Sequence, residues 1–248
     1  MRIINGCYYD ENFDLASGDI YIDDASRVFI DKSFSSDEEV IDASGLIATP
    51  CFIDSHIHGA FGADCSDLTS SAISCIASKI TSKGVVAFCP TTMTIAEKDI
   101  YRAFSSINSA QDELSDSDAE ILGVHLEGPL LNSDFCGVQD KSLCINPSDA
   151  FNLIDSIESL YPGLLKIIDI APEQEGAIEF IKTFSPSYII SLAHTASDYE
   201  MASKAFDAGA SRVTHILNAM NGCEKRAPGT VGASFDNDHV FCEIICDG

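Results

Sequence analysis

From Thr49 onward, short apolar runs alternate with longer segments of helical spacing. The segments between the runs include SSAISCIASKITSKG and DYEMASKAFDAGA, and the second contains a glycine that could cap a helix. This alternation predicts a parallel sheet, and the near-continuous apolar runs predict that it is covered on both faces. We therefore expect an α/β fold, a TIM-like (β/α)8 barrel that is incomplete, with about seven strands. The runs are Cys51–Ile57, Val85–Pro90, Ile121–Glu127, Leu165–Ala171, Tyr188–His194, Arg212–Ile216 and Phe241–Cys246.

Residues 1–48 have a different pattern. Short alternating segments such as RIINGCYYD and GDIYIDD are separated by clusters of Gly, Asp and Ser. Apolar residues at every second position between turn residues are typical of small β-strands. We expect a partial β-sandwich module over 1–48 and a barrel domain over 49–248 that lacks its last strand.

The charge balance excludes some classes of partner. The 14 basic and 39 acidic residues give a formal charge of −25, which repels nucleic acids and anionic membranes. No apolar run approaches the ~20 residues needed to span a bilayer, and the N-terminus does not resemble a secretory signal. The ten cysteines form no CxxC pair, and several lie inside apolar runs. They indicate buried thiols in a reducing compartment, so we expect a cytoplasmic protein.

Polar residues fall where four of the apolar runs end. FIDSHIHG supplies His56 and His58, GVHLEGP supplies Glu127, and SLAHTAS and VTHILNAM supply His194 and His215. In a barrel these C-terminal strand ends converge on one mouth. Both side chains of a His-x-His pair on a strand point to the same face. Because imidazole and carboxylate ligands suit zinc, iron or manganese, the pattern predicts a catalytic metal site.

Each histidine also has a structural interpretation. His194 or His215 alone could be a hydrogen-bonded core residue, and an isolated His-x-His pair is often incidental. His125 lies two residues before Glu127 and could orient a loop or a ligand carboxylate. His239, in the polar turn SFDNDHV, is expected at the surface. The metal site is favoured because ligand-type residues end four separate runs.

Several motifs resemble one family. ATPCFIDSHIHGAFGAD resembles the opening of the amidohydrolase superfamily, and HLEGPLLN, SLAHTAS, VTHILNAMN and KRAPGTVG are similar to motifs of the N-acetylglucosamine-6-phosphate deacetylases. The resemblance runs from the N-terminal module to the last residue. It implies that Glu127, His194 and His215 bind the principal divalent metal. It also implies that His56 and His58 bind or help to bind a second, giving one or two ions per subunit.

The same resemblance implies substrate contacts. Val138 and Gln139 would lie near the sugar, and Asn218 and Ala219 would meet the phosphate. Arg226 of KRAPG would reach the phosphate in the neighbouring subunit, which implies a homodimer. A guanidinium suits that role because its planar fork binds phosphate oxygens in pairs. Without the motif, Arg226 would be interpreted as an ordinary surface cation.

The implied reaction is hydrolysis of the acetamide of N-acetylglucosamine 6-phosphate to glucosamine 6-phosphate and acetate. The family places an aspartate general base on the strand after EIICDG, so we expect this residue beyond Gly248. Asp247 belongs to the preceding turn and is not assigned the role. We expect residues 1–248 to be a fragment with little or no deacetylase activity.

Two other functions stay open. The chain could be another amidohydrolase deacylase, acting on a D-amino acid or on a different N-acetyl sugar. Alternatively, it could be a catalytically inactive paralogue that binds a sugar phosphate or a partner. Release of acetate from the 6-phosphate but not from the free sugar would distinguish the deacetylase from the first alternative. Ligand binding without turnover would favour the second alternative.

Overall fold

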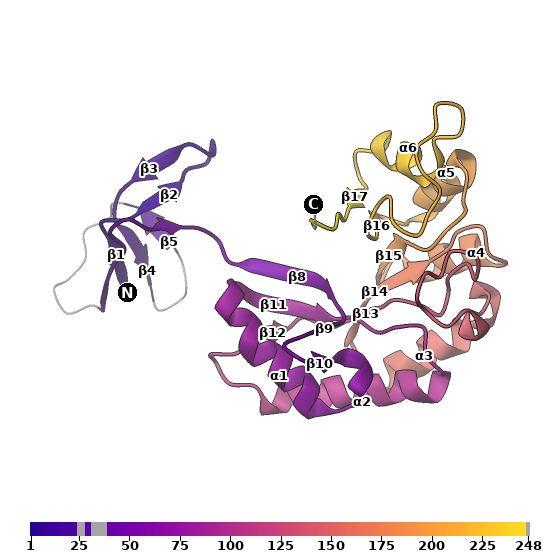
Figure 1. Ribbon diagram of the computed structural model, residues 1–248, viewed down its shortest axis with the longest axis horizontal. Helices are drawn as coiled ribbons and strands as arrows, with labels where there is room; N and C mark the ends of the chain where they lie inside the picture. Colours follow the sequence, from indigo (N-terminus) through magenta and orange to yellow (C-terminus); the bar gives the residue numbers. More distant parts are fainter. Residues whose placement is uncertain (24–27, 31–38, 247–248) are drawn as a thin grey trace. The chain divides into compact units, whose positions relative to one another are not determined.

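The computed structural model describes residues 1–23, 28–30 and 39–246. Asp247, and part of the β-module predicted over 1–48, lie outside the described residues. The chain divides into two units, Met1–Cys51 and Phe52–Gly248 (Figure 1). None of the helices in the described ranges is long and apolar enough to cross a membrane.

Short strands make up the regular structure of the first unit. One sheet has the order β5-β4-β1-β6 and the other has the order β3-β2-β7. Ile20 and Tyr21 of β4 are consecutive and both buried, so burial in this strand does not alternate residue by residue. The strands are β1 (Arg2–Ile4), β2 (Cys7–Tyr9), β3 (Leu15–Ser17), β4 (Ile20–Ile22), β5 (Val28–Ile30), β6 (Val40–Asp42) and β7 (Ile47–Ala48).

The second unit alternates strands and helices along the chain. The main strands are β8 (Phe52–Ile57), β11 (Val85–Pro90), β12 (Glu120–Ile121), β13 (Val124–Leu126), β14 (Leu165–Ile170), β15 (Ile189–Leu192), β16 (Arg212–Val213) and β17 (Phe241–Cys242). The helices are α1 (Ser70–Ile80), α2 (Glu97–Glu113), α3 (Phe151–Leu160), α4 (Ala177–Phe184), α5 (Tyr199–Ala208) and α6 (Gly229–Phe235). A small hairpin of β9 (Gly59–Ala60) and β10 (Ala63–Asp64) follows β8.

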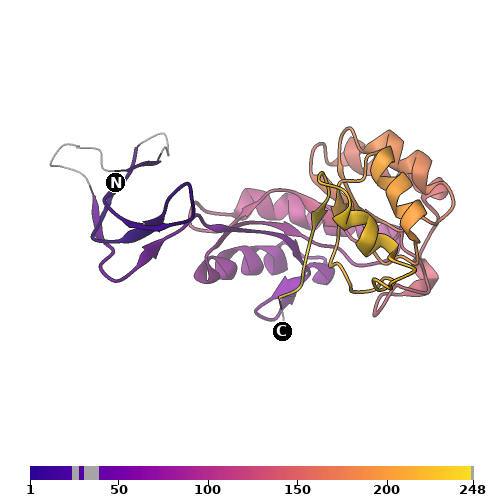
Figure 2. The same ribbon diagram turned by 90° about the horizontal axis from the view of Figure 1, so that it is seen from above.

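The main strands are parallel and follow one another in chain order. They form the sheets β12-β11-β8 and β13-β14-β15-β16-β17, which meet where Thr92 donates its backbone N–H to the His125 carbonyl at 3.0 Å. The helices lie on the outer side of this arc of strands (Figures 1 and 2). The predicted α/β class and parallel sheet are confirmed. Among the described residues no backbone pairing joins β17 to β8, so the two sheets do not form a closed barrel.

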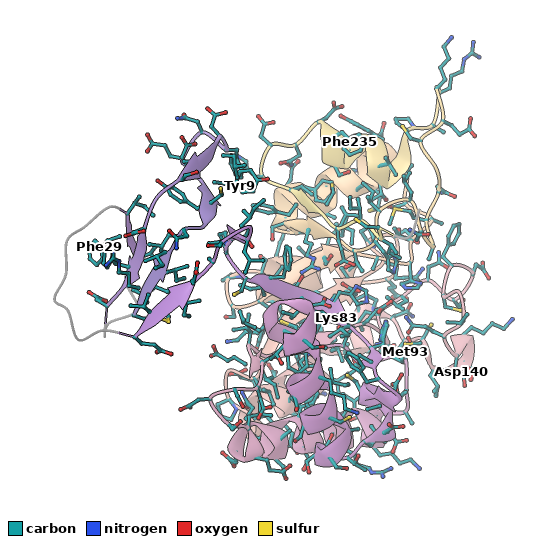
Figure 3. All side chains as sticks on the ribbon, turned by 60° about the vertical axis from the view of Figure 1, so that its left-hand side comes forward. Tyr9, Phe29, Lys83, Met93, Asp140 and Phe235 are labelled. Atoms are coloured by element: carbon teal, nitrogen blue, oxygen red, sulfur yellow. The ribbon has the colours of Figure 1, made fainter. Side chains whose placement is uncertain are left out.

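The two helical segments named in the sequence analysis form α1 and α5. Thr69 caps α1, because its side chain accepts the Ala72 N–H at 3.3 Å, and apolar residues at three- and four-residue spacing turn one face of the helix inward. Asp198 caps α5 in the same way, and Gly209 ends it with φ at 120°. The packed side chains of these helices and strands form one continuous core (Figure 3).

Four of the predicted strands are interrupted or clearly shorter than the apolar runs, and β17 covers only Phe241 and Cys242 of the 241–246 run. The 121–127 run is divided at Gly123, whose φ is 146° and where a Cβ would lie 2.6 Å from the Leu164 carbonyl oxygen. The chain leaves β15 before His194 and β16 before His215, and both residues have positive φ, 45° and 32°. The prediction of uninterrupted strands through these residues is wrong, because a left-handed residue ends the extended backbone.

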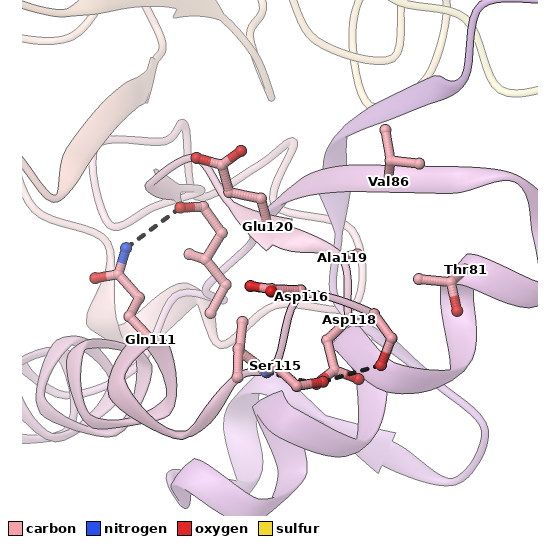
Figure 4. Close-up of a pocket in the computed structure, with 11 residues that line it drawn as sticks. Thr81, Val86, Gln111, Ser115, Asp116, Asp118, Ala119 and Glu120 are labelled. Atoms are coloured by element: carbon pink, nitrogen blue, oxygen red, sulfur yellow. Dashed lines mark hydrogen bonds between the residues drawn. The ribbon is translucent and has the colours of Figure 1, made fainter. Parts of the chain in front are cut away.

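A surface pocket lies beside the loop between α2 and β12, near the residues where β11 and β12 begin (Figure 4). Its acidic loop bonds to itself, since Asp118 accepts the backbone N–H of Ser115 at 2.9 Å. Gln111 closes another side by donating to the Ile121 carbonyl at 3.3 Å. The carboxyl ends of the strands, where functional residues of such folds gather, are at the opposite end.

Candidate metal centre

All five predicted ligands meet where strands end. His56 lies near the end of β8 and His58 follows this strand, while Glu127 directly follows β13. His194 and His215 come two residues after β15 and β16. Because these strands are parallel neighbours, their ends place residues that are distant in sequence side by side.

Glu127 is the centre of the cluster. Its side chain is buried, and each of its two oxygens faces a different pair of imidazoles. Oε2 lies 2.9 Å from His56 Nε2 and 2.8 Å from His58 Nε2. Oε1 lies 2.7 Å from His194 Nε2 and 3.5 Å from His215 Nε2. One carboxylate therefore joins two groups of donor atoms.

The spacing of the donors fits divalent ions. The Nε2 atoms are 3.2 Å apart in the His56 and His58 pair, and also in the His194 and His215 pair. Ligands about 2.0–2.1 Å from a tetrahedral zinc ion are roughly 3.3 Å from one another. Within each group of three, all donor atoms lie within 4.8 Å of one another. Each group can thus hold one ion, and the imidazole and carboxylate donors suit zinc, iron or manganese.

The hydrogen bond that a histidine ring makes through its outer nitrogen determines which ring nitrogen can bind an ion. His194 Nδ1 donates to the Phe135 carbonyl at 2.8 Å, and His58 Nδ1 donates to the Thr91 carbonyl at 3.3 Å. A carbonyl only accepts hydrogen bonds, so these Nδ1 atoms carry protons, and Nε2 is the ring nitrogen that faces the centre and can bind an ion. His215 Nδ1 is buried and has no hydrogen-bond partner among the described residues.

Electrostatics in the cluster favour charged side chains. Burial alone would raise the pKa of Glu127, but the surrounding imidazoles hold that pKa far below its ordinary value. Burial would lower the pKa of His56, whereas Glu127 and Glu243 raise the pKa of this ring to about 10. The pKa of His215 is also raised, mainly by Glu127 acting against burial. In the absence of an ion, protons therefore compensate the carboxylate, and binding of an ion would release them.

The loops that carry the ligands are held in uncommon conformations. His194 and His215 have positive φ although neither is glycine, an arrangement that costs free energy and is concentrated at functional sites. The His194 carbonyl accepts the N–H of Asn132 at 3.0 Å. Glu173 accepts the Asn132 side-chain amide at 2.8 Å and the Ala196 N–H at 2.7 Å. These hydrogen bonds keep the strained segment in place.

Of the predicted substrate residues, one lies in the cluster. Gln139 is buried, and its Nε2 donates to Glu127 Oε1 at 2.9 Å. Its Oε1 accepts the backbone N–H of Thr94 at 2.7 Å, which fixes the orientation of the amide. The neighbouring Val138 is 95% exposed.

The predicted phosphate contacts are more open to solvent. Asn218 and Arg226 are exposed and Ala219 is half-buried. The Ala219 carbonyl accepts the N–H of Thr195 at 3.1 Å, which ties this loop to the one after His194. Arg226 lines a surface pocket that it shares with Tyr199 and Asn221.

Sequence reasoning missed a layer of charged residues beneath the ligands. Glu243, after β17, accepts a hydrogen bond from His56 Nδ1 at 2.7 Å and forms an ion pair with Arg212. The sequence feature that could have indicated them is a charged residue within an apolar run, Glu243 in FCEII and Arg212 in SRVTH. Hydrogen bonds from His56 and Arg212 lower the pKa of Glu243 to about 2, against the effect of burial.

His125 belongs to the same layer. Its Nδ1 donates to the Ser55 carbonyl at 3.0 Å, and its Nε2 lies 3.0 Å from Asp169 Oδ1. Both side chains are fully buried, and Thr214 donates to the same aspartate oxygen at 2.8 Å. His125 is therefore a buried structural residue and is not a member of either ligand group.

Comparison with known proteins shows which proteins the chain is similar to. N-acetylglucosamine-6-phosphate deacetylase of Bacillus subtilis is 36% identical over 214 residues, which are 85% of this chain and 54% of that protein. The crystal structure of N-acetylglucosamine-6-phosphate deacetylase from Pasteurella multocida matches with a TM-score of 0.85 at 25% identity, over 100% of this chain and 64% of that one. The chain is a homologue of the N-acetylglucosamine-6-phosphate deacetylases.

Three further findings qualify the relationship to these deacetylases. N-acetylgalactosamine-6-phosphate deacetylase of Escherichia coli is 28% identical over 242 residues, which are 90% of this chain and 63% of that protein. The chain spans about half the length of the curated N-acetylglucosamine-6-phosphate deacetylases it matches. No family model matches it.

Proposed function

We propose that the protein hydrolyses the acetamide of N-acetylglucosamine 6-phosphate, giving glucosamine 6-phosphate and acetate, with one or two divalent ions at the candidate metal centre. The observation that carries the proposal is the buried Glu127 carboxylate between two pairs of imidazoles. The choice of substrate rests on the relatives, which are named N-acetylglucosamine-6-phosphate deacetylases.

In this proposal, Glu127, His194 and His215 hold the principal ion, and His56 and His58 hold a second with Glu127. A bound zinc, iron or manganese ion supplies Lewis acidity, which polarises an amide carbonyl and acidifies a water molecule. Gln139 contributes a directed donor, because Thr94 holds its amide with Nε2 toward the centre. The proton acceptor that we propose is an aspartate in a segment after Gly248.

The sugar phosphate is proposed to bind across the exposed loops after β16. Asn218 and the backbone at Ala219 would hydrogen-bond the phosphate, and Arg226 would reach it from the neighbouring subunit of a homodimer. Asn218 and Arg226 are both exposed, which supports this proposal, because a side chain must be accessible to contact a bound ligand or reach another subunit. Cationic groups are needed because the chain has a formal charge of −25 and the ligand is a dianion.

We also propose that the arc of strands belongs to a (β/α)8 barrel. Its strands are parallel and follow chain order, as in such barrels, and the relatives are longer than this chain. The ten cysteines are all free in the structure, which supports the proposed cytoplasmic location.

A second candidate substrate is N-acetylgalactosamine 6-phosphate, which differs from the first in the orientation of one hydroxyl group. The similarity of the chain to the N-acetylgalactosamine-6-phosphate deacetylase of Escherichia coli supports this second substrate as a candidate. Both substrates require the same amide hydrolysis, so the metal centre does not distinguish them.

Acetate release tests the proposal. Residues 1–248, and any longer product of the same reading frame, are incubated with each 6-phosphate and with unphosphorylated N-acetylglucosamine. We expect metal-dependent release from N-acetylglucosamine 6-phosphate in the product that contains the general base, and little or none from the unphosphorylated sugar. Equal rates with and without the phosphate would favour another deacylase, and ligand binding without turnover in every product would favour an inactive paralogue.

A further inference from the structure

Glu243 contacts both halves of the metal centre. Its Oε1 accepts a hydrogen bond from His56 Nδ1 at 2.7 Å and lies 3.3 Å from the backbone nitrogen of His215, which donates to it. The residue follows β17, the last strand of the arc, whereas His56 lies in β8, the first. A side-chain contact therefore connects two strands that have no backbone pairing among the described residues.

His56 differs from the other histidines in the group that holds its outer nitrogen. His58 and His194 donate to neutral backbone carbonyls, at 3.3 and 2.8 Å. His56 donates to a carboxylate at 2.7 Å, and hydrogen bonds to an ionised acceptor are shorter and stronger. Such a partner fixes the ring orientation, keeps the proton on Nδ1 and increases the basicity of Nε2 toward a metal ion.

Arg212 keeps this carboxylate in place. The guanidinium at the start of β16 is 9% exposed and forms an ion pair with Glu243 Oε2. The same Nη2 donates to Ser55 Oγ at 3.1 Å, so the arginine also reaches β8 beside His56. A buried carboxylate without a cationic partner would be strongly unfavourable, and the arginine offsets that cost.

We propose that Glu243, held by Arg212, is a positioning residue that keeps His56 Nε2 directed at the ion shared with His58 and Glu127. The number of ions that the chain holds then depends on a carboxylate at the end of β17, outside both ligand groups. This inference rests on the proposed metal centre and deepens it, because Glu243 holds the ring of a ligand of the second ion, whereas it contacts His215, a ligand of the principal ion, only at the backbone.

Zinc titration of the full chain tests the inference, with bound metal counted by mass spectrometry and affinities measured by calorimetry. Wild type should hold two ions per chain. Glu243→Gln, which preserves size but removes the charge, should weaken the second ion about 10–100-fold and leave the first within about twofold. Arg212→Lys retains the positive charge and should give a smaller loss than Arg212→Met. Glu120→Gln, an exposed carboxylate at the other end of the strands, is the matched control and should change neither affinity.

NMR of the zinc-loaded wild type tests the same contact without depending on the folding of Glu243→Gln or the Arg212 variants. A strongly hydrogen-bonded imidazole Nδ1–H signal should be present, and it should be absent from His56→Asn. Unchanged affinities in Glu243→Gln, equal loss of both ions, a wild type that holds a single ion, or a His56 ring bound through Nδ1 would each overturn the inference. A wild type that holds two ions but releases no acetate in any product would contradict the proposed function and leave this inference standing.

Discussion

Glu127 Oε1 lies 2.7 Å from His194 Nε2, although the two residues are 67 positions apart in the chain. The contact forms because both residues follow parallel strands at the same edge of the sheet. Such a short distance between a buried carboxylate and an imidazole has two chemical meanings. It is an ion pair when the ring is protonated, and one edge of a coordination sphere when an ion replaces the proton.

Replacing Glu127 with Gln should remove both ions, because the carboxylate is the one ligand common to the two groups. We expect less than a tenth of the wild-type metal content after dialysis, and loss of acetate release in the product that contains the general base. Elemental analysis and the acetate assay measure these quantities. Glu224→Gln, at an exposed position, is the control. Retention of metal and turnover in Glu127→Gln would refute the assignment of this residue.

Stability of the metal-free chain should depend on pH in a defined way. The pKa of His56 is raised from 6.5 to about 10, so its stabilising contribution is fully present below 6.5 and is lost as the pH rises through 10. The pKa of Glu243 is lowered from 4.5 to about 2, so its contribution is present above 4.5 and is lost as the pH falls through 2. These contributions are jointly greatest between pH 4.5 and 6.5.

Urea unfolding in the presence of a chelator measures this profile. The free energy of unfolding should decline from pH 6.5 to pH 10, and His56→Asn should flatten that decline because the titrating ring is gone. An alkaline decline of the same size in His56→Asn would mean that other groups cause it.

Adding zinc should stabilise the fold. An ion that binds the folded chain alone raises the free energy of unfolding by about 4 kcal/mol when its concentration is 1,000 times its dissociation constant. Thermal unfolding with and without zinc should therefore show a higher midpoint with the ion, and a chelator should reverse it. The increase should disappear in Glu127→Gln. The same increase in that variant would place the stabilising ion elsewhere.

The His125 and Asp169 pair should matter for stability. Both side chains are fully buried, and their facing atoms are 3.0 Å apart. Replacing either one with Ala leaves the other polar side chain buried without this contact, which costs about 1–3 kcal/mol. Replacing both with Leu should cost less than the sum of the two single changes. Urea unfolding measures these differences, with the exposed Glu120→Ala as a control expected within about 0.5 kcal/mol of wild type. Additive effects would show that the pair does not interact.

Arg226 should affect recognition of the phosphate and leave metal binding unchanged. Loss of a hydrogen bond to a charged group costs about 1.5–3 kcal/mol, so Arg226→Ala should raise KM for the 6-phosphate roughly 10–100-fold. The KM of Arg226→Lys should lie between those of Arg226→Ala and wild type, because Lys keeps the positive charge but lacks the planar guanidinium. Metal content is the internal control. An unchanged KM would make Arg226 an ordinary surface cation.

Much of this arrangement could be predicted from sequence, because it depends on periodicity. Apolar runs between helical segments predicted the parallel strands, and polar residues at the run ends predicted which side chains would meet. The positive φ of His194 and His215 could not be predicted, since neither is glycine and the strain is held by distant contacts such as Asn132 with His194. Glu243 and Arg212 were missed for a related reason. Their partners lie on other strands, and no spacing within one segment records a contact between β8 and β17.

Anomalous X-ray scattering from crystals grown with zinc tests the central claim most directly. We expect one peak about 2.0–2.2 Å from Glu127 Oε1, His194 Nε2 and His215 Nε2. We also expect a second, weaker peak among Glu127 Oε2, His56 Nε2 and His58 Nε2. Zinc-replete crystals with no anomalous peak at Glu127, or with zinc bound only at other residues, would contradict the account.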